Sequence, residues 1–216
     1  MAKYPLSVQD SLRDGKMTDA FYQLMMLHVP QGSKVLDPTA GYHMLWGDNL
    51  SPGIFGADYE VTFSDIAGGK DNEQLNLSRA RSDRPEWLDS FDAVVYDPPY
   101  FIGENEAKDP REAAYGGYAY SLQDLLEYMR LCHTVIPDLL KPKGKLIVKC
   151  SDQYVVSERK FYHHHYEWMR NILLAFEITD IMIYRHHRMS PTAFQVKDRP
   201  CGVVMHTYYL VGEKLS

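Results

Sequence analysis

The tetrapeptide Asp97-Pro98-Pro99-Tyr100 directly follows residues 91–96, an apolar run with the composition of a buried strand. Proline has no N–H to donate to a sheet ladder, so two prolines end the strand and fix an extended exit for the chain. The residues on either side are thereby held in defined positions. Because a carboxylate accepts hydrogen bonds and a tyrosine ring stacks on flat groups, this spacing suits a flat ring that carries N–H groups.

Two further acids end strand-like segments earlier in the chain. Residues 33–37 read as a first strand that ends at Asp37, and the turn Pro-Thr-Ala-Gly follows at 38–41. Residues 60–64 read as a second strand, which ends at Asp65. In α/β sheets the carboxyl ends of the strands bind nucleotides, and an acid there can accept hydrogen bonds from ribose hydroxyls. Ordinary turn chemistry is the alternative explanation for Asp65.

Strand-like and helix-like segments alternate along the whole chain, which is typical of an α/β domain with a mainly parallel sheet. Seven strands are predicted, at 33–37, 60–64, 74–77, 91–96, 145–149, 177–184 and 206–211. Helices are predicted at 7–27, 42–50, 121–140 and 166–175. Since there is neither a repeat nor a composition break, we predict a single domain over residues 1–216.

The composition limits the class of protein. A chain of 216 residues with 45% hydrophobic residues can bury a substantial core. There is no 18-residue apolar run and no apolar signal-peptide core, and three cysteines are too few for a disulfide framework. We therefore expect a soluble cytoplasmic protein without a membrane role. The net charge of −6 argues against a chain that is basic all round, but a local basic patch can still bind nucleic acid.

The order of the 37–41 turn, Asp65 and the DPPY tetrapeptide resembles S-adenosylmethionine-dependent amino-methyltransferases. This group carries [DNS]PP[YFW] and modifies adenine or cytosine in DNA and guanine or adenine in RNA. The resemblance covers about residues 16–214, and HTYYLVGEK (206–214) is similar to the closing hairpin of the DNA adenine-N(6)/cytosine-N(4) methyltransferases. It implies a Rossmann-like class I methyltransferase fold, with a mostly parallel seven-stranded sheet, helices on both faces and a C-terminal antiparallel hairpin.

The resemblance also implies roles for individual residues. The implied catalytic residues are Asp97, Pro98, Pro99 and Tyr100. The Asp97 carboxylate and the Pro98 carbonyl would each accept a hydrogen of an exocyclic amino group, and the Tyr100 ring would stack on a base taken out of its duplex. The methyl group would then move in line to nitrogen, without a covalent intermediate or a metal. The implied cofactor is S-adenosyl-L-methionine, with binding residues Asp37, Pro38, Thr39, Ala40, Gly41, Asp65 and Asn76.

The cofactor turn departs from the family pattern D-P-F-x-G-S-G at two positions. Thr39 replaces the phenylalanine, and His43 stands where the second glycine is expected. Tyr42 and His43 would crowd a tight turn. These departures leave open the hypothesis that the chain is a non-catalytic binding subunit, which has the fold but has lost the cofactor.

Two polar segments are candidates for substrate contact. The segment at about 101–120 reads as a substrate loop, in which Phe101, Tyr118 and Tyr120 offer stacking faces; a disordered surface loop is the alternative. The segment at about 185–201 is basic, and Arg185 and Arg188 could contact phosphate; a merely solvated loop is the alternative.

The histidine run in FYHHHYEWMR (161–170) raises the question of a metal site. Three adjacent histidines cannot all face one ion on a helix or strand, and no cysteine or carboxylate stands at ligand spacing beside them, so we predict no metal site. Cys132 and Cys150 are predicted to be core residues of a helix and a strand.

Three functions are consistent with these patterns. The first is methyl transfer to adenine, or to cytosine, in DNA; DPPY favours adenine and HTYYLVGEK favours DNA over RNA. The second is an RNA methyltransferase acting on the guanine 2-amino or adenine 6-amino group. The third is the non-catalytic subunit. Because no target-recognition domain is evident, recognition falls to the two polar segments, to a protein partner or to a homo-oligomer.

Overall fold

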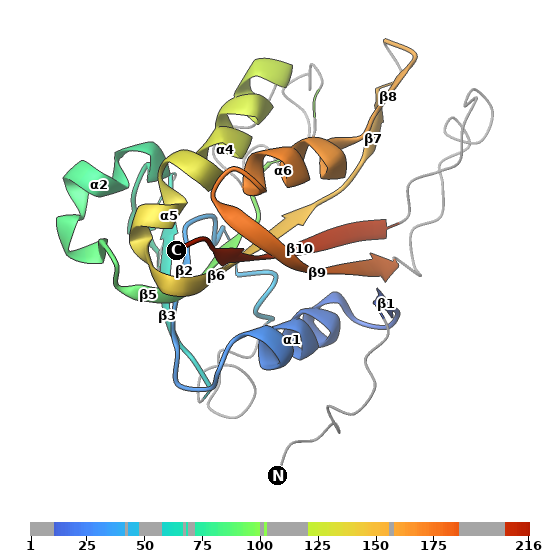
Figure 1. The fold of residues 1–216 in the computed structure, drawn as a ribbon. Helices are drawn as coiled ribbons and strands as arrows, with labels where there is room; N and C mark the ends of the chain where they lie inside the picture. The colour runs from blue at the N-terminus through green and yellow to red at the C-terminus, as the bar shows by residue number, and fades with distance from the viewer. Residues whose placement is uncertain are drawn as a thin grey trace.

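The computed structural model describes residues 11–41, 43–47, 58–66, 68, 72–99, 102, 121–155, 158–185 and 206–216. Within these residues one large sheet is packed between helices (Figure 1). Its strands are β1 (Leu12–Arg13), β2 (Lys34–Asp37), β3 (Glu60–Asp65), β4 (Glu73–Gln74), β5 (Phe91–Tyr96), β6 (Leu140–Cys150), β9 (Phe176–Arg185) and β10 (His206–Lys214). A separate hairpin consists of β7 (Gln153–Val155) and β8 (Lys160–Tyr162). The helices are α1 (Met17–His28), α2 (Ala80–Asp83), α4 (Leu122–Thr134), α5 (Ile136–Leu139) and α6 (His164–Ile172), with short 3-10 turns at Leu77–Arg79 and Pro85–Trp87.

The strands lie in the order β1-β9-β10-β6-β5-β2-β3-β4. Strands β6, β5, β2, β3 and β4 are parallel neighbours, whereas β10 runs antiparallel to both β6 and β9. The predicted mostly parallel sheet and the C-terminal antiparallel hairpin are therefore confirmed. Six of the seven predicted strands are present. In place of the strand predicted at 74–77, the structure has only β4 at Glu73–Gln74, because Asn76 caps a 3-10 turn that begins at Leu77. In addition, β1 is a two-residue edge strand parallel to β9. An edge strand of two residues is too short to show a period of its own in the sequence.

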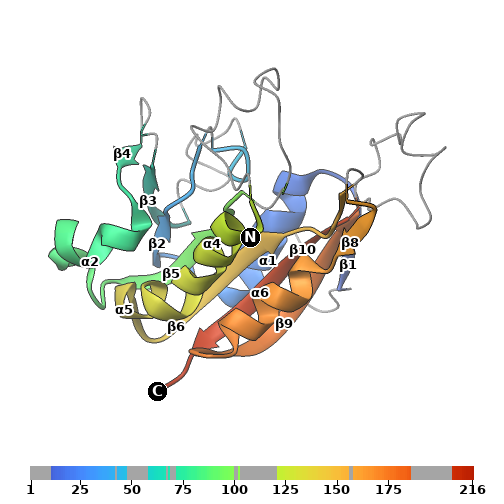
Figure 2. The same cartoon turned by 90° about the horizontal axis from the view of Figure 1, so that it is seen from above.

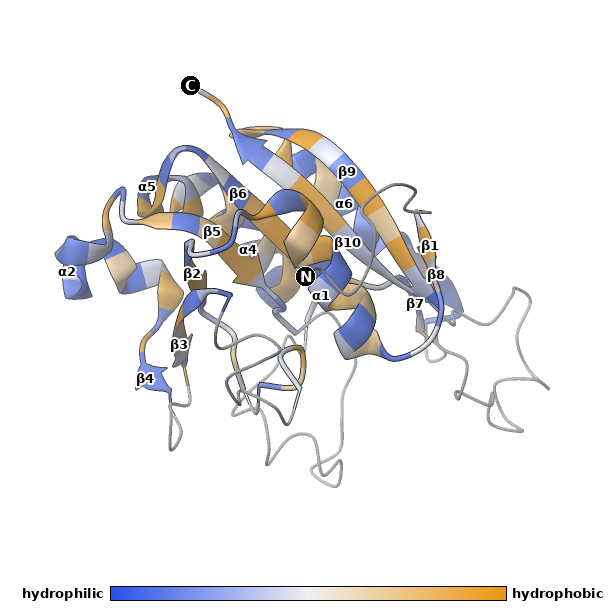
Figure 3. Cartoon of the chain, turned by 90° about the horizontal axis from the view of Figure 1, so that it is seen from below, coloured by the Kyte–Doolittle hydropathy of each residue, from blue (hydrophilic) through white to orange (hydrophobic). Residues whose placement is uncertain are grey.

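Helices cover both faces of the sheet, as predicted. Helix α1 lies on one face, and α4, α5 and α6 lie on the other (Figures 1 and 2). Because side chains of a strand alternate between faces, β5 sends Val94 and Tyr96 into the core beneath α4 and α6, and Ala93 and Val95 into the core beneath α1. Figure 3 shows apolar residues on the strands and on the helix surfaces that face them. Among the described residues no helix is long and apolar enough to span a membrane.

The first two predicted helices differ from the structure. The chain is not helical over 11–16, where β1 and a turn precede α1; Gly15 has a φ of +102° there, which a right-handed helix cannot accommodate. The predicted helix at 42–50 is a turn over its described residues, 43–47. His43 and Gly47 both have positive φ, at 56° and 77°, so the backbone leaves the helical region at both ends of this turn.

The long predicted helix at 121–140 begins as expected but is divided. Ser121 forms a capping box with Asp124, in which each side chain accepts the other residue's backbone N–H. The helix ends at Thr134 and a short helix, α5, follows with Pro137 in its first turn. Proline lacks the N–H that continues an α-helix, so this position suits a new helix start. The chain then enters β6 at Leu140, earlier than predicted.

Candidate active site

Three carboxylates lie at the carboxyl edge of the parallel sheet. Strand β2 ends at Asp37 and its neighbour β3 ends at Asp65. On the other side of β2, strand β5 ends at Tyr96 and Asp97 follows directly. Carboxyl ends of adjacent parallel strands meet at one edge, which is where ligands bind in open α/β sheets. The structure therefore brings the acids of the three predicted motifs together.

The Asp37 side chain organises the turn that follows β2. It is buried, and its Oδ1 accepts the backbone N–H of Thr39 at 3.0 Å while its Oδ2 accepts the indole N–H of Trp46 at 2.8 Å. Burial raises the pKa of this carboxyl to about 6, and the nearby Asp97 charge adds to the rise, although the hydrogen bonds from Trp46 and Thr39 oppose it. Both carboxylate oxygens of Asp37 thus stabilise the turn by accepting hydrogen bonds from its residues.

Thr39 joins the cofactor turn to the start of the DPPY segment. Its hydroxyl accepts the backbone N–H of Asp97 at 2.8 Å and donates to Oδ1 of Asp37 at 3.3 Å. A phenylalanine, which the family pattern has at this position, could make neither bond. The departure at Thr39 therefore has a structural function: it ties the carboxyl ends of β2 and β5 to each other.

Asp65 and Asn72 hold the other end of the turn. Oδ2 of Asp65 accepts the backbone N–H of Gly41 at 3.1 Å, and the Asn72 amide donates to the Gly41 carbonyl at 2.8 Å. The Asn72 Oδ1 is paired with Nε2 of His43 at 2.5 Å. The His43 ring stacks on Phe63 with 4.1 Å between ring centroids, so its side chain packs against β3.

Sequence reasoning missed Trp46 and Asn72 as parts of this site. Asn72 lies in a polar segment without periodicity, and no local signal connects it to the 37–41 turn. Asn76, which was predicted to bind cofactor, is exposed, and its Oδ1 caps the 3-10 turn at Leu77–Arg79 by accepting from the backbone N–H and hydroxyl of Ser78. That oxygen therefore has a local structural use.

The Asp97 carboxylate forms an ion pair with a lysine that was not among the predicted site residues. Nζ of Lys149, next to the end of β6, donates to Oδ2 of Asp97 at 2.6 Å. The lysine and aspartate side chains are 10% and 21% exposed. Pro98 is buried and Pro99 is partly buried, so the strand exit is packed against the protein.

The chain beyond the prolines is anchored at one described residue. The Gln153 side chain accepts the backbone N–H of Ile102 at 2.7 Å and donates to its carbonyl at 2.8 Å. The predicted catalytic residue Tyr100 lies outside the described residues, as do the predicted substrate residues Phe101, Tyr118, Tyr120 and Arg188, most of 101–120, and 186–201. Arg185, at the end of β9, is described, and its guanidinium pairs with both carboxylate oxygens of Asp14 at 2.8 Å.

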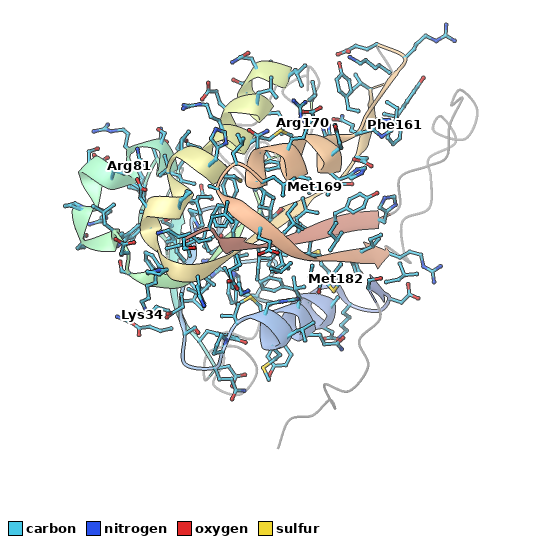
Figure 4. All side chains as sticks on the ribbon, viewed as in Figure 1. Lys34, Arg81, Phe161, Met169, Arg170 and Met182 are labelled. Atoms are coloured by element: carbon cyan, nitrogen blue, oxygen red, sulfur yellow. The ribbon has the colours of Figure 1, made fainter. Side chains whose placement is uncertain are left out.

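The three histidines at 163–165 make separate contacts. His163 packs on Phe161, His164 stacks on Tyr162, and His165 places Nδ1 at 2.7 Å and 2.8 Å from the two carboxylate oxygens of Asp152. Phe161 belongs to β8, beside the start of α6 (Figure 4). Burial lowers the pKa of His164 to about 4. Among the described residues no three histidines, cysteines or acids are grouped as metal ligands would be.

The two described cysteines are core residues, as predicted. Cys132 lies in α4 and Cys150 ends β6, and both are fully buried. Burial raises the pKa of each thiol well above its ordinary value, so neither is a reactive thiolate.

Several solved structures are similar to this chain. The chain is similar to TrmN from Thermus thermophilus, at 14% identity over 92% of this chain and 48% of that one, with a TM-score of 0.50. It also matches a SAM-dependent methyltransferase from Methanosarcina mazei (15% identity, 89% of this chain and 97% of that one, TM-score 0.48). A third match is the cytosine-N4-specific PvuII DNA methyltransferase (12% identity, 57% of this chain and 42% of that one, TM-score 0.40).

The likeness to TrmN, together with the strand order, confirms the predicted Rossmann-like class I methyltransferase fold. At these identities the comparison concerns the fold alone. The chain spans about half the length of several of the structures that it matches. No protein-family model and no curated protein matches the sequence.

Proposed function

We propose that this chain is an S-adenosylmethionine-dependent methyltransferase that acts on an exocyclic amino group of a nucleobase, adenine or cytosine in DNA. The observation that carries the proposal is the fixed position of Asp97. Its backbone is bonded to the 37–41 turn through Thr39, and its carboxylate is paired with Lys149, at the edge of the sheet where such folds bind ligands. The Asp97 carboxylate, the proposed hydrogen-bond acceptor for the substrate, is thereby held next to the predicted cofactor turn.

The residues around the turn fit the cofactor. Gly41 has a φ of 48° and has no side chain, so a ligand can approach its backbone closely. Asp65 uses Oδ2 for the Gly41 N–H, and a carboxylate has about four lone-pair positions, so it can still accept ribose hydroxyls. When bound, S-adenosylmethionine supplies a methyl group activated by a sulfonium centre.

The chain's own part in the reaction is to hold the amino group. An exocyclic amino nitrogen is a poor nucleophile because its lone pair is conjugated with the ring. If the Asp97 carboxylate and the Pro98 carbonyl each accept one of its hydrogens, the nitrogen becomes more tetrahedral and its lone pair points away from the ring plane. Positioning and electrostatics then account for the rate enhancement. The Tyr100 ring is proposed to stack on the base.

The chain is proposed to act as one domain over residues 1–216. Recognition of nucleic acid is assigned to the loops at about 101–120 and 185–201, with Phe101, Tyr118, Tyr120, Arg185 and Arg188 as contacts, or to a protein partner or homo-oligomer. DNA is preferred to RNA because HTYYLVGEK is similar to the closing hairpin of DNA methylases.

Transfer of label from methyl-tritiated S-adenosylmethionine tests this function. The chain is incubated in parallel with unmethylated duplex DNA, single-stranded DNA and total RNA, and the labelled nucleoside is identified. N6-methyladenine or N4-methylcytosine in DNA supports the proposal. Label in RNA would replace DNA by RNA as the substrate, and absence of both label and cofactor binding would favour the non-catalytic subunit.

A further inference from the structure

We propose that Lys149 is a positioning residue for methyl transfer: it holds Asp97 by one carboxylate oxygen, Oδ2, and directs Oδ1 to the amino group of the substrate. The inference rests on the proposed function and adds a residue that the DPPY motif does not contain. Its structural basis is the 2.6 Å contact between Nζ of Lys149 and Oδ2 of Asp97.

The register of the sheet sets this contact. Strands β5 and β6 are parallel, with Tyr96 opposite Val148, so the residues that follow each of them, Asp97 and Lys149, are neighbours across the pair. Val95 and Ile147 both belong to the core beneath α1, and alternation places Asp97 and Lys149 on that same face. Both side chains therefore leave the strands in the same direction at the sheet's edge.

Burial makes the contact more than a surface ion pair. The Lys149 side chain is only 10% exposed, and lysine is rarely buried without a partner because its ammonium group loses hydration. Exposed ion pairs are weak and readily rearranged, whereas a largely buried pair is held in one geometry. Asp97 is thus restrained at its side chain by Lys149 and at its backbone N–H by Thr39.

Several acidic groups lie near Lys149 and Asp97 at this edge of the sheet. Asp37 lies close enough to Asp97 for the Asp97 charge to raise the Asp37 pKa, and the Cys150 thiol is affected by the charges of both Asp97 and Asp152. The Lys149 ammonium group is paired with Asp97 and balances its charge. A carboxylate held in this way acts as an acceptor of fixed direction, which is what a conjugated amino group requires.

A structural role alone is the competing explanation, and the same strand offers a matched control. Lys145, in the middle of β6, pairs with Glu213 of β10, also at 2.6 Å, and the two side chains are 21% and 35% exposed. Lys145→Met removes a comparable ion pair on the same strand that does not involve Asp97. It is expected to leave kcat at the wild-type value.

The test is a double-mutant cycle on kcat for transfer of tritium label to the nucleic acid that the wild-type chain modifies. Lys149→Met is expected to lower kcat about 100-fold, as a small misplacement of a reacting group does. Cofactor affinity, measured by isothermal titration calorimetry, should change little. Lys149→Arg retains the charge and should recover part of the loss. In an Asp97→Asn background, Lys149→Met should lower kcat no further, because Lys149 acts through Asp97.

Each outcome decides between the explanations. Equal loss of kcat from Lys149→Met in both backgrounds, or an active Lys149→Met chain, would overturn the positioning role and leave the proposed function intact. Thermal unfolding shows whether Lys149→Met folds. If it does not, the folded Lys149→Arg chain is used in its place. Wild-type kcat in both Lys149→Arg and Asp97→Asn would then overturn the inference. A wild-type chain that labels no nucleic acid overturns the proposed function and this inference together.

Discussion

Replacing Thr39 by valine is the most direct test of how the site is assembled. Valine has nearly the same shape as threonine, so the substitution removes the hydroxyl and little else. The Asp97 backbone N–H loses its acceptor at 2.8 Å, and the buried Asp37 carboxylate loses a donor at 3.3 Å. Both losses occur in the bonds that join the cofactor turn to the DPPY segment.

The magnitude follows from the burial of these groups. A buried N–H left without an acceptor costs about 1–3 kcal/mol. Since the Thr39–Asp97 bond is only partly buried, we expect the lower half of this range, about 1–2 kcal/mol of unfolding free energy. With an m-value of about 2 kcal/mol per molar urea, the midpoint of unfolding falls by about 0.5–1 M. We also expect kcat to fall, because Asp97 loses one of its two restraints.

Urea unfolding followed by circular dichroism measures the first effect, and label transfer measures the second. Thr39→Ser retains the hydroxyl and serves as the control, with a midpoint and kcat close to wild type. A Thr39→Val chain with wild-type stability and wild-type kcat would show that the Thr39 hydroxyl does not connect the two strand ends, and the site would have to be rebuilt around Asp97 and Lys149 alone.

Three further predictions concern single residues. Asp97→Ala should abolish methyl transfer and leave the affinity for S-adenosylmethionine nearly unchanged by calorimetry; loss of both would mean that Asp97 is misassigned. Because burial raises the pKa of Asp37 from 3.8 to about 6, this residue contributes stability below about pH 3.8 that is lost as the pH rises through 6. Unfolding free energy measured from pH 3.8 to 6.5 should therefore lose up to about 3 kcal/mol more in wild type than in Asp37→Asn, and parallel curves would contradict the assignment. Ser121→Ala removes the capping box with Asp124 and should lower the stability by about 1 kcal/mol without changing kcat; an unchanged melting temperature would argue against the cap.

Local patterns in the sequence predicted most of the elements correctly. The apolar run at 91–96, followed by Asp97 and two prolines, is strand β5, and Ser121 is the N-cap of α4, at the predicted start of that helix. Such features are readable because they depend on neighbours within a few residues. The turn at 43–47 differs from the predicted helix because His43 and Gly47 have positive φ. The His43 ring there packs on Phe63, twenty residues away in the chain and on another strand, a contact with no local sign in the sequence.

The α/β alternation, six of the seven predicted strands and the placement of Asp37, Asp65 and Asp97 at strand ends follow from the sequence alone. Hydrophobic periodicity and proline chemistry are local, and parallel strands bring their carboxyl ends to one edge whatever the connections. The long-range contacts of the site come from the tertiary structure: Lys149 with the Asp97 carboxylate, the Thr39 hydroxyl with the Asp97 backbone N–H, and Asn72 with the Gly41 carbonyl. These contacts depend on the register between strands and on which loop passes over which strand end. Because the paired residues are 31 to 58 positions apart, no local pattern in the sequence indicates the contacts.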